Sequence, residues 1–197
     1  MKNDVLRRKE HEAVRNGVGY YDFTHQVLDV KGKDAATFLD KVFVNDIKNM
    51  KKGHALYTTM LNEEGKIIDD VIVFRLEDDK YLISTLYIDK MIKWFDKFKG
   101  GCDIYYKDIT AKLTMFALQG PKSRDLVNKI VDKDISSMKF FTIEDNNVGD
   151  LDIMVARAGF TGELGYELYV ESSKKEVLEE KIKECGKEFG LVNITTD

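Results

Sequence analysis

Two adjacent acids, Asp69 and Asp70, are the residues of this sequence that most suggest chemistry. They follow a polar segment at residues 62–65, which lies between apolar runs at 55–61 and 67–74. That pattern is typical of a β-hairpin. Asp is a poor strand residue, and neighbouring strand side chains point to opposite faces. We therefore expect one carboxylate to face solvent and the other to face the covered side or a cleft, where it needs a partner. The alternative is that both acids only cap the hairpin.

A second unusual stretch is residues 157–167, which read RAGFTGELGYE. Three glycines in this short run predict a tight, irregular loop where the backbone can approach a ligand. No G-x-x-x-x-G-K-[ST] pattern is present, and the loop does not lead from a strand into a helix, so a phosphate-binding turn is not indicated. A purely structural turn is the alternative.

The three histidines, His11, His25 and His54, give little direct signal. None accompanies a Ser or Cys in a nucleophile motif, and none has a partner at metal-ligand spacing. We expect His11 and His54 to be surface or packing residues and predict no metal site. His25 follows a strand-like segment, and whether it lines a cleft stays open.

Composition indicates an ordinary globular chain of 197 residues with a net charge of −4. Acidic and basic residues are interspersed, which argues against a nucleic-acid groove. No apolar run approaches the roughly 18 residues of a membrane span, and the charged first residues lack the apolar core of a signal peptide. Cys102 and Cys185 lack metal-ligand spacing and are expected to be free thiols. We expect a cytoplasmic protein.

Hydrophobic periodicity and turn residues predict the elements that position these groups. Helices are expected at residues 4–16, 35–42, 87–98, 121–130 and 173–189. Strands are expected at residues 27–30, 55–61, 67–74, 80–85, 102–106, 113–118, 140–143, 151–156 and 166–170.

The element order repeats as β-α-β-β-β-α, and an offset of 88 positions carries Gly32 onto Gly120. The same offset matches Phe38 with Leu126, Leu39 with Val127, Lys41 with Lys129, Val42 with Ile130, Asp46 with Asp134, Ile47 with Ile135 and Met50 with Met138. This favours an ancient duplication over chance. The fold class predicted is α+β, with two similar lobes of antiparallel sheet that carry helices on one face. The expected domains are residues 1–110 and 111–197, with a ligand site where the lobes meet.

Together these segments resemble the aminomethyltransferase (T-protein) family of the glycine cleavage system, and more broadly the related folate-binding transferases. The resemblance runs through most of the chain. It rests on residues 14–25, 30–35, 45–46, Tyr57, 61–62 with Gly65, 67–70, 119–121 and 157–167. The Gly-Phe-Thr-Gly-Glu-x-Gly-x-Glu run and the Asp-Asp hairpin are its most specific parts.

The resemblance implies a tetrahydrofolate site in a central opening between domains. Asp70 matches the key family carboxylate, which would contact the pterin and tune the folate nitrogen that accepts the one-carbon unit. Tyr57 matches an aromatic residue that lines the pterin. Phe160 stands where the family usually has Tyr, so stacking is kept and a hydroxyl is lost. Glu167 matches the acid that hydrogen-bonds the pterin's amino edge, and a carboxylate can accept two adjacent N–H donors in a fork.

The implied reaction moves a one-carbon unit from an aminomethyl-lipoyl carrier protein (H-protein-like) to tetrahydrofolate. Catalysis would consist mostly of positioning and of electrostatics around the leaving amine. The chain stops at Asp197, before the family's Gly-x-Ala-Arg-Asp segment and C-terminal barrel, and it also lacks the segment that usually precedes the first helix. A separate chain that supplies the C-terminal domain is therefore a possible partner.

Other departures leave the donor open. Gln26 stands where the glycine-cleavage enzymes usually carry Met, and Ser84-Thr85 replaces the usual Asn-Ala. One alternative is a tetrahydrofolate-dependent demethylase of a small methylated compound. Another is a non-catalytic folate-binding module like the relatives tied to iron–sulfur cluster maintenance, but the cysteine of their motif is absent from residues 157–167. A third is a fragment that needs a second polypeptide, which a large apolar patch would favour.

Overall fold

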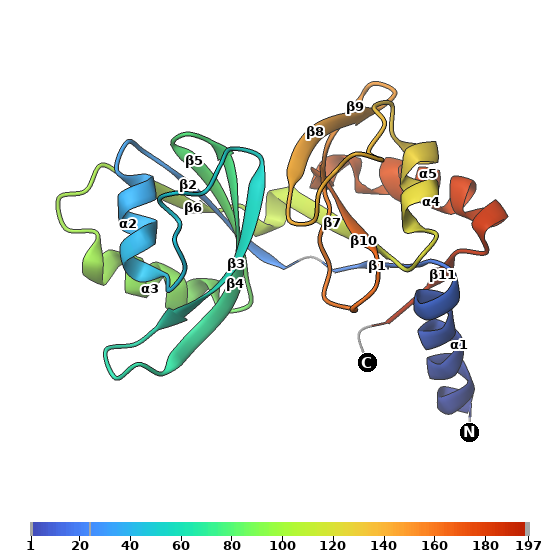
Figure 1. Cartoon of the computed structure of the whole chain (residues 1–197), viewed down its shortest axis with the longest axis horizontal. Coiled ribbons are helices and arrows are strands. Elements are labelled where there is room, and N and C mark those ends of the chain that lie inside the picture. The colour runs from blue at the N-terminus through green and yellow to red at the C-terminus, as the bar shows by residue number, and fades with distance from the viewer. Residues whose placement is uncertain (1, 24, 196–197) are drawn as a thin grey trace. The chain divides into compact units, whose positions relative to one another are not determined.

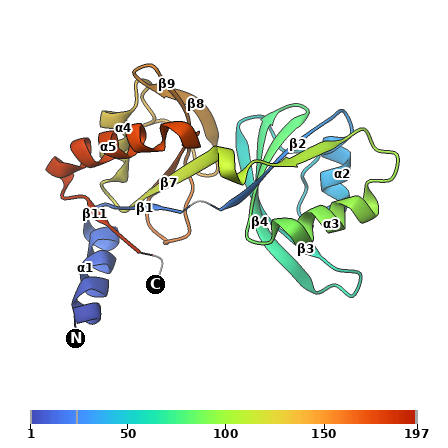
Figure 2. The same cartoon turned by 180° about the vertical axis from the view of Figure 1, so that it is seen from behind.

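The computed structural model describes residues 2–23 and 25–195, which form two compact units. We call residues 25–111 the first lobe, and residues 2–23 together with 112–195 the second lobe. Figures 1 and 2 show both lobes from opposite sides, the first in light blue to green and the second in the colours of the two chain ends. Each lobe is an antiparallel-dominated sheet with helices.

The first lobe contains a five-stranded sheet in the order β3-β4-β5-β2-β6. Its elements are β2 (Gln26–Lys31), α2 (Ala35–Val42), β3 (His54–Leu61), β4 (Ile67–Glu77), β5 (Lys80–Thr85), α3 (Ile88–Phe98) and β6 (Tyr105–Asp108). All neighbouring strands pair antiparallel. The predicted hairpin is present as β3 and β4, and Gly65 in its turn has a φ of +76°, a conformation that favours glycine.

The core of the first lobe lies between one face of this sheet and helices α2 and α3. Val71 and Val73 project from β4 into it, as strand alternation requires. Phe38 of α2 and Phe95 of α3 meet edge to face there, with ring centroids 5.1 Å apart. Burying side chains of this size stabilises the fold by roughly 1.5–3 kcal/mol each. Tyr57 and Asp70 are not part of this core and lie on the opposite face of the sheet.

The second lobe contains a six-stranded sheet in the order β11-β1-β7-β10-β9-β8. Its elements are α1 (Lys2–Asn16), β1 (Gly19–Asp22), β7 (Leu113–Gln119), α4 (Ser123–Ile130), β8 (Ile143–Val148), β9 (Leu151–Ala156), β10 (Gly165–Glu171), η2 (Ser172–Lys174), α5 (Lys175–Gly186), η3 (Lys187–Phe189) and β11 (Val192–Asn193); η1 (Thr110–Lys112) precedes β7. Among the strands of the described residues, only β1 and β11 pair parallel. Helices α4 and α5 share one core with the sheet.

The repeat predicted from the sequence is visible in the geometry of each lobe. Helices α2 and α4 begin and end at positions that differ by the predicted offset. Gly32 and Gly120, which precede them, have φ angles of +139° and +128°. A Cβ would lie 2.2 Å from the Asp103 carbonyl oxygen at Gly32, and 2.5 Å from the Gly17 carbonyl oxygen at Gly120. Both positions therefore require glycine for the same reason, the close approach of another backbone segment.

The division of the chain differs from the expected split after residue 110. Strand β1 pairs along its whole length with β7, so residues 2–23 belong to the second lobe. Val18 and Tyr20 explain this placement, because they bury their side chains in the core formed by α4, α5 and the second sheet. Strand β1 lies beside β7 as β6 lies beside β2. Residues 1 and 24 fall outside the described part of the chain.

Two expected strands are displaced. The strand expected at 140–143 is wrong, because β8 runs from Ile143 to Val148. Phe141 has a φ of +57°, which is incompatible with a strand, and Phe140 is exposed. The strand expected at 102–106 begins only at Tyr105. Aromatic residues favour strands in general, and here that preference is overridden by the turn that leads into β8.

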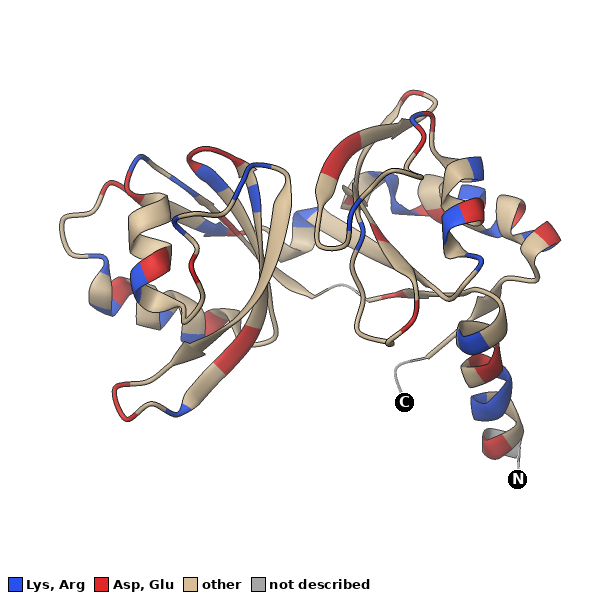
Figure 3. Ribbon diagram, viewed as in Figure 1, with Lys and Arg blue, Asp and Glu red and all other residues tan. Residues whose placement is uncertain are grey.

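Lys and Arg residues and Asp and Glu residues occur along the ribbon of both lobes, as the blue and red segments of Figure 3 show. In residues 2–23 and 25–195, no helix is long and apolar enough to cross a membrane. Within the same ranges, no three acidic, histidine or cysteine side chains gather as a metal site.

Candidate functional site

The adjacent acids of the hairpin point to opposite faces of the first sheet, as predicted. Asp70 is exposed, whereas Asp69 is only 2% exposed. The Thr85 hydroxyl donates a hydrogen bond to Asp69 Oδ2, and the Tyr87 amide donates to Thr85 Oγ1 at 3.0 Å. Burial raises the pKa of Asp69. Asp69 thus organises the chain that enters α3 and leaves Asp70 as the acid that faces outward.

Asp70 forms a polar pair with Tyr57 of the neighbouring strand. The Tyr57 hydroxyl donates to Asp70 Oδ2 at 2.8 Å, and the Tyr57 side chain is half exposed. The two residues are diagonal neighbours, because β3 and β4 pair Tyr57 with Ile72. The hydrogen bond to Asp70 raises the pKa of Tyr57. This charge-assisted bond fixes the carboxylate on the sheet face that points away from α2 and α3.

The same face carries a second polar pair, His25 and Ser84. Ser84 of β5 lies opposite Ile72 of β4, which places it next to the Tyr57–Asp70 pair. The Ser84 hydroxyl lies 2.8 Å from His25 Nδ1. Burial lowers the pKa of His25 to about 4, so the imidazole is neutral at pH 7. Ser84 was noted in the sequence only as a departure from a family pattern, and its contact with His25 was not predicted.

Glu167 is a buried acid on the second lobe. It lies on β10, is 2% exposed, and points away from the core that Tyr166 and Leu168 enter. The Tyr169 hydroxyl donates to Glu167 Oε2 at 2.7 Å. Burial raises the pKa of Glu167 to about 7. A buried carboxyl group that titrates near neutrality can accept hydrogen bonds in one state and donate one in the other, which is typical of functional sites.

Aromatic side chains lie on the same face of the second sheet. Phe160 is 62% exposed, and its ring centroid lies 5.5 Å from that of Phe23 and 6.2 Å from that of Tyr21. The Tyr21 hydroxyl is buried and has no hydrogen-bond partner among the described residues. Burial and the charge of Glu167 raise the pKa of Tyr21. A buried hydroxyl without a partner costs roughly 1–3 kcal/mol, which makes the Tyr21 hydroxyl a candidate contact for a bound group.

The glycine-rich loop that carries Phe160 is folded around the side chain of Gln119. The Thr161 hydroxyl donates to Gln119 Oε1 at 2.8 Å, and Gln119 Nε2 donates to the Ala158 carbonyl at 3.2 Å. A Cβ at Gly159 or Gly165 would lie 2.3 or 2.2 Å from the Gln119 amide. These two glycines therefore admit a side chain of the same protein. The sequence left open whether these glycines allow an approach to a ligand or form a purely structural turn.

The four site residues predicted from the sequence fall into two pairs. Tyr57 and Asp70 are hydrogen-bonded in the first lobe. Phe160 and Glu167 share one face of the second lobe, where Tyr21 touches both: its ring meets that of Phe160, and the Glu167 charge acts on its hydroxyl. Each lobe thus combines an acid with aromatic side chains. Sequence reasoning missed Tyr21, because a tyrosine in a strand reads as an ordinary core residue.

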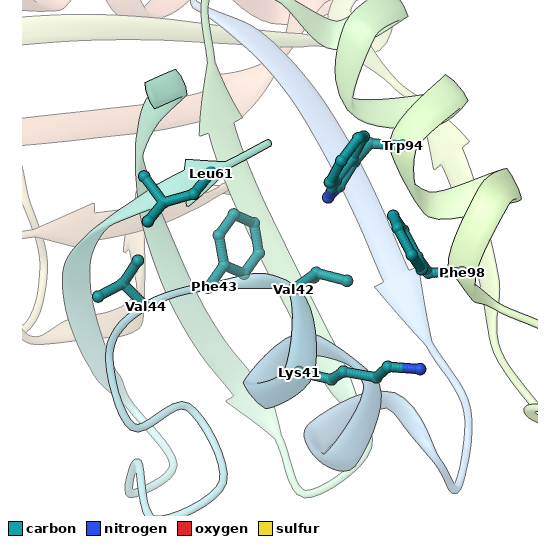
Figure 4. A pocket seen from close by; sticks show the side chains of 7 residues that line it. All are labelled: Lys41, Val42, Phe43, Val44, Leu61, Trp94 and Phe98. Carbon is teal, nitrogen blue, oxygen red and sulfur yellow. The ribbon is translucent and has the colours of Figure 1, made fainter. Parts of the chain in front are cut away.

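A separate apolar hollow of about 240 Å³ lies on the helix side of the first lobe, and Figure 4 shows the side chains around it. It is lined by Lys41, Val42, Phe43, Val44, Leu61, Trp94 and Phe98. None of the four predicted site residues lines it.

Sequence comparison places this chain beside aminomethyltransferases. A family model described as the GCVT N-terminal domain matches residues 3–197. The aminomethyltransferase of Thermoanaerobacter sp. (strain X514) is 37% identical over 186 residues, which cover 92% of this chain and 50% of that protein. The aminomethyltransferase of Caldanaerobacter subterraneus subsp. tengcongensis gives the same identity and coverage. The chain therefore spans about half the length of these curated relatives.

Solved structures show the same fold. The glycine cleavage system aminomethyltransferase T from Bartonella henselae superposes with a TM-score of 0.79 at 25% identity, over 90% of this chain and 48% of that one. A chain of the heterotetrameric sarcosine oxidase from Corynebacterium sp. U-96 gives a TM-score of 0.69 at 14% identity, over 97% of this chain and 96% of that one. The predicted fold class, two α+β lobes, is confirmed.

Proposed function

Because this chain belongs to the GCVT N-terminal domain family, we propose that it is the folate-binding part of an aminomethyltransferase-like enzyme. The observation that carries the proposal is an acid beside aromatic rings on each lobe. Asp70 is hydrogen-bonded to Tyr57, and Glu167 lies near Tyr21, whose ring meets that of Phe160. The strand residues among them lie on the sheet face that points away from the helices of their lobe. Tetrahydrofolate, when bound, supplies the nitrogen that accepts the one-carbon unit.

The second lobe offers groups that suit a pterin. The Glu167 carboxyl is held at one oxygen by Tyr169, and its pKa of about 7 suits it to the edge of a ring that carries both N–H donors and nitrogen acceptors. The Tyr21 hydroxyl needs a partner that no described residue gives. The exposed Phe160 ring provides a surface on which a planar ring can stack. We propose that these residues hold and orient the pterin.

The first lobe offers the group proposed to act in the transfer. Tyr57 holds the Asp70 carboxylate in one orientation by a bond of 2.8 Å. A carboxylate fixed in this way stabilises positive charge as it develops on an amine, and it needs no reorganisation during the reaction. We propose Asp70 as the catalytic residue and Tyr57 as its orienting partner, which also lines the pterin.

We propose an aminomethyl-lipoyl carrier protein as the donor. A small methylated compound is a second candidate, favoured by the neutral His25–Ser84 pair beside Asp70, because an uncharged polar pair can hold a small polar substrate. Since the chain spans half the length of its curated relatives, we propose the complete reaction for an assembly that includes the other half, on this polypeptide or on a second one.

The test is calorimetric titration of the purified chain with tetrahydrofolate under anaerobic conditions. We expect micromolar binding by the wild type, weakened roughly tenfold or more in Asp70→Ala and in Glu167→Ala. Asp152→Ala is the matched control. Asp152 occupies in β9 the place that Asp70 has in β4, and it is likewise exposed. Like Asp70, it accepts a hydrogen bond from a side chain of the neighbouring strand, here from Asn147 Nδ2 at 2.7 Å.

Binding that is equal in all three variants would contradict the assignment of the site. No binding by the wild type would contradict the proposal that this chain carries the pterin site. Where binding is confirmed, single-turnover transfer from an aminomethyl-lipoyl carrier protein, compared with transfer from an N-methyl amino acid, decides between the two donors.

A further inference from the structure

We propose that Gln119 is a positioning residue: its buried amide fixes the loop at residues 158–164 and thereby the ring of Phe160. The part of this inference that concerns ligand affinity rests on the proposed function. The part that concerns loop order stands on contacts within the second lobe alone.

The contacts of Gln119 bracket Phe160 on both sides along the chain. Gln119 is fully buried. Its Nε2 donates to the carbonyl of Ala158 at 3.2 Å, and its Oε1 accepts from the Thr161 hydroxyl at 2.8 Å. One amide therefore uses a donor and an acceptor to hold the loop before and after the exposed ring. Only a side chain with both functions can make this pair of bonds.

The loop sequence is shaped to admit this amide. Gly159 and Gly165 lie against it so closely that a Cβ at either position would come within 2.3 Å of a Gln119 amide atom. A purely structural turn would not need two glycines directed at one buried side chain. The spacing of the glycines is thus explained by the amide that they enclose.

The first lobe shows that the shared scaffold does not require this arrangement. Lys31 of β2 stands where Gln119 stands in β7, because each is the last residue of its strand and pairs with the first residue of the following sheet neighbour, Lys80 or Gly165. Lys31 is exposed. The connection between β4 and β5, residues 78–79, is shorter than the one between β9 and β10, residues 157–164. The amide therefore serves the loop that distinguishes the second lobe.

The loop has other links. The carbonyl of its last residue, Leu164, accepts hydrogen bonds from the Gly120 amide at 2.7 Å and from the Ser123 hydroxyl at 3.2 Å, which fix the end that enters β10. A side-chain link closer to Phe160 is weak. Arg15 Nη1 lies 2.8 Å from Glu163 Oε1, but both side chains are partly exposed. Ion pairs of this kind contribute little, because solvent screens them. We therefore expect the buried amide, rather than this ion pair, to determine whether the Phe160 ring keeps its place beside Tyr21 and Phe23.

The experiment combines amide hydrogen exchange by mass spectrometry with titration of tetrahydrofolate. Gln119→Met keeps the approximate volume and removes both polar functions, and Lys31→Met is the matched control in the first lobe. We expect Gln119→Met to speed exchange in residues 159–163 roughly tenfold or more, while β9 and β10 keep their protection. Lys31→Met leaves the loop unchanged.

A second variant separates positioning from general packing. A protonated carboxyl has one donor and one acceptor, so Gln119→Glu should restore loop protection as the pH falls and lose it as the pH rises. Relative to the protection of β9 and β10, the protection of the loop should not change with pH in this way in the wild type or in Gln119→Met. If Gln119→Met fails to fold, Thr161→Val removes one anchor alone and should speed exchange of the same loop.

Unchanged loop exchange in Gln119→Met and in Thr161→Val would overturn the inference, as would a Gln119→Glu variant without pH dependence. A loosened loop with roughly tenfold weaker tetrahydrofolate binding supports it in full. A loosened loop in a protein whose wild type binds no tetrahydrofolate would support the positioning role and contradict the proposed function, so the two failures are distinguishable.

Discussion

Arg75 in the first lobe and Arg157 in the second make the same contact and then lead into different connections. Each guanidinium donates to a backbone carbonyl, that of Met50 at 2.5 Å and that of Met138 at 2.7 Å. Both Nε atoms are buried without a hydrogen-bond partner among the described residues. After Arg75 the chain turns directly into β5, whereas after Arg157 it builds the loop that presents Phe160.

The difference separates scaffold from function. The features present in both lobes, such as helices α2 and α4 with the glycines that precede them, serve the packing of each sheet. The features present in only one lobe are where a ligand is proposed to bind: the Tyr57–Asp70 pair in the first, and Glu167 with the Phe160 loop in the second. This agrees with the general placement of function on groups added to a common fold.

The comparison predicts first that Gly32→Ala and Gly120→Ala are about equally damaging. Each Cβ would clash with backbone at a φ that L-residues rarely adopt, so we expect each to lower the free energy of unfolding by roughly 3 kcal/mol or more. Urea unfolding measures both. A large loss in one lobe and tolerance in the other would show that the two glycines are not equivalent.

The next effect concerns pH and the second lobe. Because the pKa of Glu167 is raised from 4.5 to about 7, the folded state binds more protons than the unfolded state between these values. Stability should therefore fall as the pH rises from about 4.5 to 7, by roughly 3 kcal/mol at most. The residue that matches Glu167 in the first lobe is Leu82, which does not titrate, so the effect belongs to the second lobe. Glu167→Gln should flatten the dependence of the urea midpoint on pH. If the variant kept the pH dependence of the wild type, a group other than Glu167 would be responsible for it.

A smaller effect tests the packing of the loop around Gln119. Gly165→Ala should cost roughly 1–3 kcal/mol, because its Cβ would overlap the Gln119 amide. In a background of Gln119→Ala the same change should cost clearly less, so the double-mutant cycle should show coupling. Additive losses would mean that Gln119 does not occupy the space that Gly165 leaves open.

Tyr21→Phe should raise stability in the absence of ligand by about 1 kcal/mol, because it removes a buried hydroxyl without a described partner. The same change should weaken tetrahydrofolate binding if that hydroxyl contacts the ligand. Thermal unfolding with and without tetrahydrofolate measures both effects. Lower stability in the absence of ligand would indicate that water or another group already satisfies the hydroxyl.

The smallest expected effect on stability is that of the exposed acids. Asp70→Ala and Asp152→Ala should each change the free energy of unfolding by less than about 0.5–1 kcal/mol, since both are exposed. Only Asp70→Ala should abolish one-carbon transfer. Equal activity of the two variants, measured in the same single-turnover assay, would remove Asp70 from its proposed role.

The sequence predicted the parts of the fold that local patterns determine. The hairpin, the two equivalent helices and the opposite orientation of Asp69 and Asp70 follow from alternation, turn residues and periodicity. The place of β1 could not be predicted in this way, because its partner β7 lies far along the chain and many strands would suit the same four residues. The start of β8 was missed because the aromatic pair before it resembles a strand.

For the site, the sequence indicated the acids and rings but not what holds them. Gln119 was noted as part of a family motif, yet its contacts with Ala158 and Thr161 depend on a loop that folds back from a distant segment. The burial of Glu167, which raises its pKa to about 7, likewise depends on neighbouring strands that a linear pattern does not reveal.

Strand β1 precedes the first lobe in the sequence but belongs to the second sheet, and this determines the order in which the two lobes can fold during synthesis. The first lobe is one continuous segment, so it can fold as soon as residue 111 has left the ribosome. Strand β1 is made earlier, but its partner β7 is complete only at Gln119, and the neighbouring β11 ends only at Asn193. The second sheet can therefore form only after the first lobe has been synthesised, and the whole first lobe separates β1 from β7 along the chain, which slows the folding of the second sheet.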